Sequence, residues 1–156
     1  MSDAVDRFRE AARVLGHDLD VRRFPQGTRT ARDAARAIGC DVGQIVKSLV
    51  FTADGRAVLA LTSGANRVDL SSLAATAGAS SARMANADEV RAATGFAIGG
   101  TPPFGHPAAL PTFLDRDLLG YEEIWAAAGT PESVFRTTPG ELLSATGATV
   151  ADFRQG

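Results

Sequence analysis

The sequence predicts one α+β domain in which a mixed, partly barrel-like β-sheet is flanked by helices. Its helical and strand-like segments interleave without the regular βαβ alternation of a doubly wound parallel sheet. An Asp-Gly pair at 54–55 separates two apolar runs, which is a strong hairpin signal. The 156 residues suffice for one full core but not for two ordinary domains, so we expect a single domain over 1–156.

The first third of the chain carries start and stop signals for two helices. Residues 3–15 place apolar side chains at helical spacing, and Gly16 follows as a stop. The next helix is expected to run from Thr30, whose side chain can cap it, to Gly39, which can close it. Between these helices, residues 19–24 alternate weakly and are expected to form a strand.

The rest of the chain alternates between strand and helix signals. A helix that begins at Asp69 is expected to turn Leu70, Leu73 and Ala74 toward the core. Glycine and proline are densest at 96–107, which we expect to be a loop. The expected strands are 45–53, 56–62, 109–114, 123–128 and 133–137, and the expected helices are 69–76, 86–95 and 139–146.

Composition and charge exclude several classes of function. The formal net charge is −2, so any nucleic-acid contact must come from a local patch. Two histidines and one cysteine cannot form a standard zinc site, and we expect neither a metal nor an organic cofactor. No stretch approaches the roughly 20 apolar residues of a membrane span, and the charged N-terminus lacks the apolar part of a secretory signal. We therefore expect a cytoplasmic protein that does not bind membranes.

Lys47 is the only lysine among 16 basic residues, and it lies within an apolar, β-branched run. Arginine is a planar and permanently charged fork, whereas lysine is a compact point charge whose pKa changes readily on burial. A chain that uses arginine elsewhere but keeps one lysine in a strand is expected to need an ammonium there. The alternative is a lysine that reaches solvent from the end of a strand without a function.

The glycine- and proline-rich segment is the second candidate for chemistry. Three glycines in 98–107 allow close approach of a ligand to the backbone, and two prolines stiffen the same loop. Such a loop can present backbone N–H and C=O groups to a ligand, or it can simply connect two strands. His106 in this loop can act as a general base or polar anchor, or it can cap a backbone carbonyl.

Two further groups of charged residues have both a functional and a structural interpretation. Asp115 and Asp117 can bind a metal, although a solvated turn at the end of a strand is favoured. Five arginines that precede Lys47 can contact nucleic-acid phosphates, or they can cover a solvated surface. These arginines are Arg22, Arg23, Arg29, Arg32 and Arg36.

Four segments, taken in order, resemble motifs of the YbaK/prolyl-tRNA synthetase editing-domain family. They are a helix and connector at 30–39, a Lys-Ser-Leu-Val strand within 44–51, an Arg-x-Asp-Leu-x-x-Leu helix entry at 67–73, and a Gly-Gly-x-x-Pro-Phe-Gly loop within 98–106. The order and spacing of all four match, and the resemblance covers roughly residues 20–145.

The resemblance implies an aminoacyl-tRNA deacylase that acts in trans. Such an enzyme hydrolyses an amino acid wrongly esterified to a tRNA, typically tRNA for proline that carries alanine, cysteine or another small residue. It implies a compact mixed sheet with helices around it, no metal and no cofactor. Its partners would be aminoacyl-tRNA and, transiently, prolyl-tRNA synthetase, and the expected oligomeric state is a monomer or a homodimer.

The resemblance also implies the site residues. Lys47 would be catalytic and hold the phosphate and ribose end of the terminal adenosine, and the backbone of Gly100 would contact the aminoacyl ester. Ser48 would help to shape the pocket. The residues expected to bind substrate are Phe24, Thr28, Ser48, Gly99, Thr101, Pro103, Phe104, Gly105 and His106.

One departure from the family pattern leaves the substrate open. Members that act on cysteine carry a Gly-x-Asp pattern in their last third, whereas residues 129–136 of this chain provide no matching aspartate. Alanine or another small residue is therefore at least as well supported as cysteine. Two alternatives from other classes stay open: a non-catalytic RNA- or nucleotide-binding accessory module of a synthetase, and an enzyme that uses Lys47 to form a Schiff base.

Overall fold

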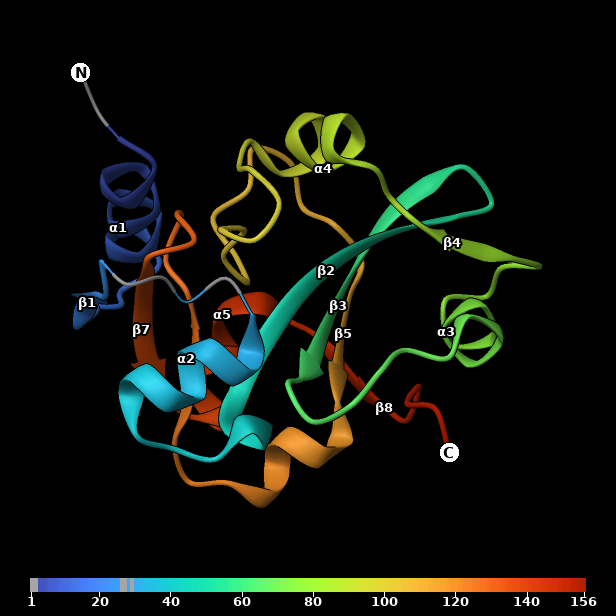
Figure 1. Ribbon diagram of the computed structural model, residues 1–156. Helices are drawn as coiled ribbons and strands as arrows, with labels where there is room; N and C mark the ends of the chain where they lie inside the picture. Colours follow the sequence, from blue (N-terminus) through green and yellow to red (C-terminus); the bar gives the residue numbers. More distant parts are fainter. Residues whose placement is uncertain (1–2, 26–27, 29) are drawn as a thin grey trace.

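The computed structural model describes residues 3–25, 28 and 30–156, which form an open, eight-stranded mixed sheet flanked by helices (Figure 1). The strand order is β1-β7-β6-β2-β3-β5-β8, and β4 pairs with β2 outside this path. The predicted α+β class with a mixed sheet is confirmed, and the sheet is not closed into a barrel. The strands are β1 (Val21–Arg23), β2 (Ile45–Ala53), β3 (Arg56–Ser63), β4 (Ala82–Met84), β5 (Thr112–Asp115), β6 (Ile124–Ala127), β7 (Ser133–Thr137) and β8 (Thr149–Ala151).

The helices lie on both faces and at both ends of this sheet. Figure 1 shows α1 beside β7 and β1 at one end, and α3 near β4 at the other. No helix in the described part of the chain is both long enough and apolar enough to cross a membrane. The helices are α1 (Ala4–Val14), α2 (Ala31–Ile38), α3 (Leu70–Thr76), α4 (Ala87–Thr94) and α5 (Pro139–Thr146), with short 3₁₀ turns η1 (Val42–Gln44) and η2 (Arg116–Gly120).

The β2–β3 hairpin confirms the Asp-Gly signal. Asp54 and Gly55 both have positive φ, at 48° and 82°, which is the backbone that a type I′ two-residue turn requires. Their tight turn sets an unbroken antiparallel register from Ala53↔Arg56 to Val46↔Ser63. The longest strands of the sheet therefore come from one local sequence signal.

Helix α2 begins and ends where its sequence signals predict. The Thr30 hydroxyl accepts a hydrogen bond from the Asp33 N–H at 3.0 Å, and Gly39 closes the helix in the left-handed conformation with φ of 87°. The buried face of the helix, Ala34 and Ala35, packs on Ile45, Trp125 and Val134 of the sheet. This packing covers the face of β2 that also carries Lys47.

The main core lies on the opposite face of the sheet. Phe8 of α1 is fully buried, and its ring lies 5.0 Å from the rings of both Phe104 and Phe135, measured between centroids. Val46 and Val50 of β2 belong to the same cluster. Because strand side chains alternate between faces, β2 contributes to both cores, with even-numbered residues on this one.

Two expectations about the elements are wrong, and two short strands were not expected. Leu70 is 42% exposed rather than turned toward the core, while Leu73 and Ala74 are buried as predicted. The predicted strand from residue 109 begins only at Thr112. The three-residue strands β4 and β8 carry no recognisable sequence pattern, because their pairing with β2 and β5 depends on distant parts of the chain.

The ladder along one side of β2 is interrupted, and this interruption positions the site. On one side β2 pairs with β3 over its whole length. On the other side it pairs with β6 only at Ile45 and Val46, and with β4 only from Phe51 to Ala53. Residues 47–50 therefore have no strand partner on that side, which leaves an opening in the sheet beside Lys47.

Candidate active site

A cavity of about 600 Å³ occupies this opening in the sheet. Side chains from both faces of β2 line it: Lys47 lies on the same face as Ile45, and Ser48 on the same face as Val46 and Val50. Helix α2, the loop at 64–67, strand β6 and the glycine-rich loop supply the other walls. Of the residues predicted from the sequence, those that line the cavity are Thr28, Lys47, Ser48, Gly99 and Thr101.

Lys47 is half-buried in the wall of this cavity. Its Nζ donates a hydrogen bond to the backbone carbonyl of Asn66 at 2.6 Å. Burial and the nearby guanidinium of Arg67 lower the pKa of Lys47 from its ordinary value, and the carboxylate of Asp115 opposes this. Lys47 forms no ion pair within the described residues, so its charge is available to an anionic ligand.

Two further cations, Arg32 of α2 and Arg67, line the same cavity. Neither forms an ion pair with any residue that the structure describes. Arg22 and Arg23, by contrast, pair with Asp20 and Glu132.

The predicted arginine group is therefore divided. Arg32 faces the cavity, and Arg36 is exposed one helical turn further along α2. Arg29 lies outside the described residues. The cavity thus carries positive charge from three side chains, although the whole chain is slightly acidic.

The glycine-rich loop is split between two places. Gly99 and Thr101 line the cavity, and the Thr101 hydroxyl donates to the Ala97 carbonyl at 3.1 Å. Gly100 is buried, and its N–H also donates to Ala97, so this donor is already occupied. A Cβ at Gly100 would lie 2.7 Å from the Cα of Thr130, so close packing accounts for a glycine here.

We expect Gly100→Ala to destabilise the fold by about 1–3 kcal/mol, because the added methyl meets backbone atoms that cannot move aside. Deacylation by the variant, measured well below its thermal transition, should stay within about threefold of wild type, since the Gly100 N–H is already bonded. A matched comparison is Gly140→Ala, where nothing lies within 4 Å of the new Cβ. A fall in activity of more than about tenfold without loss of stability would instead restore the predicted catalytic role of Gly100.

The last part of the loop lines a different hollow, of about 410 Å³, against α1 and α5. Phe104 is buried there in ring contact with Phe8. The residues of the predicted site that line this second hollow are Pro103, Phe104, Gly105 and His106. The structure does not bring these four to the cavity beside Lys47.

His106 is held within its own loop. Its Nε2 lies 2.8 Å from the carbonyl oxygen of Pro102, to which the ring N–H donates, and its ring packs edge-on against Phe96. Burial lowers the pKa of His106, which favours the neutral imidazole. This geometry matches the carbonyl-capping interpretation. Phe24 also lies apart from the cavity lining, packed against the cluster beneath α2.

Two buried polar groups on the cavity wall have no hydrogen-bond partner within the described residues: the hydroxyl of Ser48 and the indole N–H of Trp125. Trp125 is only 3% exposed. An unsatisfied buried donor costs about 1–3 kcal/mol, and a bound ligand that accepts from it recovers part of this cost. Sequence reasoning missed Trp125, because nothing in its local pattern distinguishes it from a core tryptophan.

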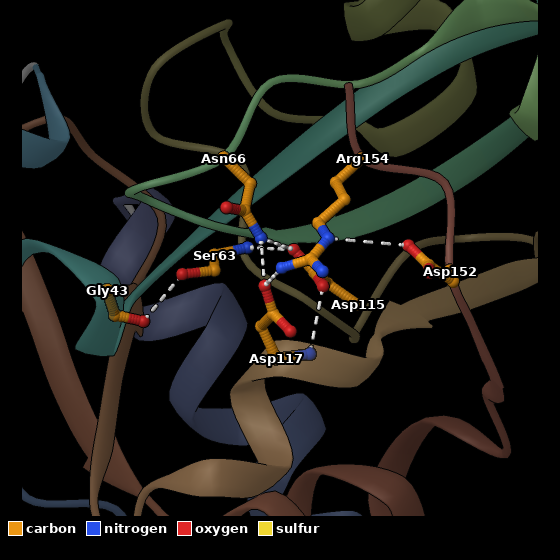
Figure 2. A network of polar contacts seen from close by, with 7 residues as sticks. All are labelled: Gly43, Ser63, Asn66, Asp115, Asp117, Asp152 and Arg154. Atoms are coloured by element: carbon orange, nitrogen blue, oxygen red, sulfur yellow. Dashed lines mark hydrogen bonds and ion pairs between the residues drawn. The ribbon is translucent and has the colours of Figure 1, made fainter. Parts of the chain in front are cut away.

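The interpretation of Asp115 as part of a solvated turn is wrong. Asp115 is 1% exposed, and its carboxylate accepts hydrogen bonds from the N–H groups of Ser63 and Asp117, each at 3.0 Å (Figure 2). In the ranges that the structure describes, no group of three or more His, Cys, Asp or Glu side chains is arranged to hold a metal ion. Asp115 is thus an internal acceptor that joins the ends of β3 and β5.

Comparison with known proteins identifies the family of this chain. A family model for the aminoacyl-tRNA editing domain matches residues 25–145. A solved structure described as a trans-editing enzyme for prolyl-tRNA synthetase is 52% identical, with a TM-score of 0.94, and the match covers 100% of this chain and 99% of that one. The structure of the hypothetical protein APE2540 is 30% identical, with a TM-score of 0.87 and coverage of 96% and 99%.

Curated relatives extend this result. YwhH of Bacillus subtilis is 34% identical over 124 residues, which are 79% of this chain and 78% of YwhH. EbsC of Enterococcus faecalis, described as a Cys-tRNA(Pro)/Cys-tRNA(Cys) deacylase, is 29% identical over 79% of this chain and 76% of its own. Proline–tRNA ligase of Streptococcus sanguinis is 26% identical over 98% of this chain but only 25% of the ligase. The resemblance is confirmed: the chain belongs to the aminoacyl-tRNA editing domain family and is an editing enzyme.

Proposed function

We propose that this chain hydrolyses, in trans, the ester of tRNA for proline that carries alanine or another small amino acid. The main support for this proposal is the cavity at the opening of the sheet. Lys47 lines this cavity and forms no ion pair with any described residue. The relative described as a trans-editing enzyme for prolyl-tRNA synthetase supports the choice of tRNA. EbsC supports cysteine as one candidate ester. Since tRNA is charged in the cytoplasm, we expect the enzyme to act there.

Charge complementarity supports the assignment of the 3′ end of a tRNA to this cavity. Lys47, Arg32 and Arg67 all line it, and a tRNA end brings phosphates that such cations bind. Lysine serves as a compact charge for one phosphate oxygen, while the planar arginines can each hold two. In this proposal the cations hold the nucleotide, and the interior of the cavity receives the aminoacyl group.

The open side of β2 supplies backbone groups for the ester. The carbonyl of Val50 accepts from the Ala85 N–H on the β4 side, whereas the carbonyl of Ile45 accepts from Gly64 on the β3 side. Because backbone groups of a strand alternate in direction, the N–H and C=O of Ser48 point the same way as those of Val50, into the opening. An N–H in this position can stabilise the oxyanion that forms when water attacks the ester carbonyl.

The proposed reaction needs no protein nucleophile. The described cavity lining contains no Cys, His, Asp or Glu side chain. An aminoacyl ester is already activated, so a positioned water can attack its carbonyl carbon, and the ribose oxygen leaves with a proton. The ribose hydroxyl beside the ester is the group best placed to move that proton. Hydrolysis at a second site is also what discrimination between small, similar amino acids requires, because a synthetase pocket cannot exclude them strongly.

The proposal is tested by charging tRNA for proline separately with alanine, cysteine, serine and proline, and measuring ester loss with and without the enzyme. We expect rapid loss of at least one small non-proline ester, and loss of the prolyl ester at the uncatalysed rate. No turnover of any ester, with the tRNA still bound, would favour the non-catalytic RNA-binding module. That alternative draws support from the same lining, which holds three cations and no Cys, His, Asp or Glu side chain among the described residues.

A further inference from the structure

Lys47 is connected through a single residue to a polar network on the side of the sheet where β3 and β5 end. The backbone carbonyl of Asn66 accepts the hydrogen bond from Lys47 Nζ at 2.6 Å. The side-chain amide of the same residue donates to Oδ2 of Asp115 at 2.9 Å and to Oδ2 of Asp117 at 2.8 Å (Figure 2). Asn66 is thus held at its side chain and contacts Lys47 through its main chain.

Asp115, the buried one of the two carboxylates that bind the Asn66 amide, is held rigidly. Asp115 is buried at the end of β5, which pairs in parallel with β3 through Leu61↔Leu114. Its Oδ2 accepts from the Ser63 N–H as well as from Asn66, and its Oδ1 accepts from the Asp117 N–H. The two backbone N–H groups that donate to this carboxylate belong to the end of β3 and to η2, so Asp115 is held to the sheet independently of the Asn66 loop.

Asp117, the more exposed of the two carboxylates, is held by an ion pair with Arg154. Arg154 donates to Oδ2 of Asp117 at 2.6 Å, and its Nε lies 3.7 Å from Asp152 (Figure 2). The hydrogen bonds from Asn66 and Arg154 lower the pKa of Asp117, so it is ionised at neutral pH. Two neighbouring carboxylates would repel one another, and the Asn66 amide lies between them as a shared donor.

We propose that Asn66 is a positioning residue for Lys47: Asp115 and Asp117 clamp its amide, and the clamp fixes the carbonyl that orients the Lys47 ammonium toward the cavity. The role of this ammonium in deacylation rests on the proposed function, whereas the clamp itself does not. The segment between β3 and α3 is a turn, in which the Asn66 N–H donates to the Ser63 carbonyl at 2.9 Å. Among the described residues of this turn, only the Asn66 side chain donates hydrogen bonds to the two carboxylates.

The surroundings of Lys47 can be measured by NMR without overlap, because it is the only lysine in the chain. Protein grown with lysine labelled by ¹³C at the ε-carbon gives a single lysine signal, whose position and pH titration describe Lys47 alone. The charged groups that act on it are Arg67, which lowers its pKa, and Asp115, which raises it. A carbonyl that accepts from the ammonium favours the charged form, so loss of a fixed Asn66 carbonyl should lower the pKa further.

The test compares Asn66→Ala with Arg154→Ala as the matched control. Arg154 is the exposed outer member of the network, and its removal leaves both amide bonds of Asn66 in place. In Asn66→Ala we expect a shifted lysine signal, a lower titration midpoint, and a fall in kcat/KM for deacylation of about tenfold or more, because the ammonium that holds the nucleotide is displaced. In Arg154→Ala we expect the lysine signal and kcat/KM of the wild type.

Two results would overturn the proposal. The first is an Asn66→Ala protein that is folded and keeps the wild-type lysine signal and titration midpoint, whatever its activity. The second is an equal fall in kcat/KM for both variants at equal loss of thermal stability, which would make the network purely structural. Failure of the wild-type enzyme to hydrolyse any ester would reject the proposed function alone, because the lysine signal still decides whether the clamp positions Lys47.

Discussion

Replacement of Lys47 by alanine should lower kcat/KM for the hydrolysed ester by about 10- to 100-fold, which corresponds to loss of one charge-assisted hydrogen bond of about 1.5–3 kcal/mol. The ammonium is half-buried, makes no ion pair within the described residues and lines the cavity. Single-turnover deacylation with enzyme in excess measures the effect on the chemical step separately from tRNA release.

Two variants control this result. Arg56→Ala also removes one positive charge, but Arg56 begins β3 at the hairpin, outside the cavity lining, so it should deacylate at the wild-type rate. Lys47→Arg should keep part of the tRNA affinity, because a guanidinium still binds phosphate, while its different shape impairs the reaction. Full activity in Lys47→Ala would show that the cavity beside it is not where the ester is cleaved. Loss of activity in Lys47→Arg together with trapping of a carbonyl substrate by borohydride would favour the Schiff-base alternative.

The largest effect on stability is expected for Phe8→Ala, at about 3–5 kcal/mol, with a fall in Tm of roughly 10 °C. Phe8 is fully buried in α1, and its ring lies against Phe104 and Phe135. Helix α1 precedes the residues that the family model matches, yet it completes the main core. Thermal unfolding followed by circular dichroism gives the measurement.

The matched control lies on the same helix. Val14 is 73% exposed, so Val14→Ala should change stability by no more than about 0.5 kcal/mol. Below its transition, Phe8→Ala should still deacylate, because the hollow beside Phe104 is separate from the cavity beside Lys47. A Phe8→Ala protein with unchanged Tm and strongly reduced activity would contradict both the packing argument and the separation of the two hollows.

Local signals predicted much of this fold because their causes are local. The Asp54-Gly55 pair forces positive φ and thereby sets the hairpin register, and Thr30 and Gly39 mark the ends of α2 through their own hydrogen bonds and conformation. Composition alone distinguishes Lys47, since it is the one ammonium side chain beside fifteen arginines.

The arrangement of the site could not be predicted in the same way. The opening beside residues 47–50 exists because β4 and β6, from distant parts of the chain, pair with the two ends of β2 and stop short of its middle. The glycine-rich loop divides between two hollows because α1 packs against its second half, at Phe104. The burial of Asp115 likewise depends on Ser63 and Asn66, which lie some fifty residues earlier.

The most direct test of substrate binding beside Lys47 is to titrate ¹³C-lysine-labelled and ¹⁵N-labelled enzyme with a non-hydrolysable substrate mimic, adenosine that carries alanine through a 3′-amide instead of the ester. We expect saturable shifts of the Lys47 signal and of the Ser48 and Thr101 amides, with the His106 amide unchanged. Shifts centred on Phe104 and His106, with Lys47 unaffected, would contradict it and would place the substrate in the second hollow.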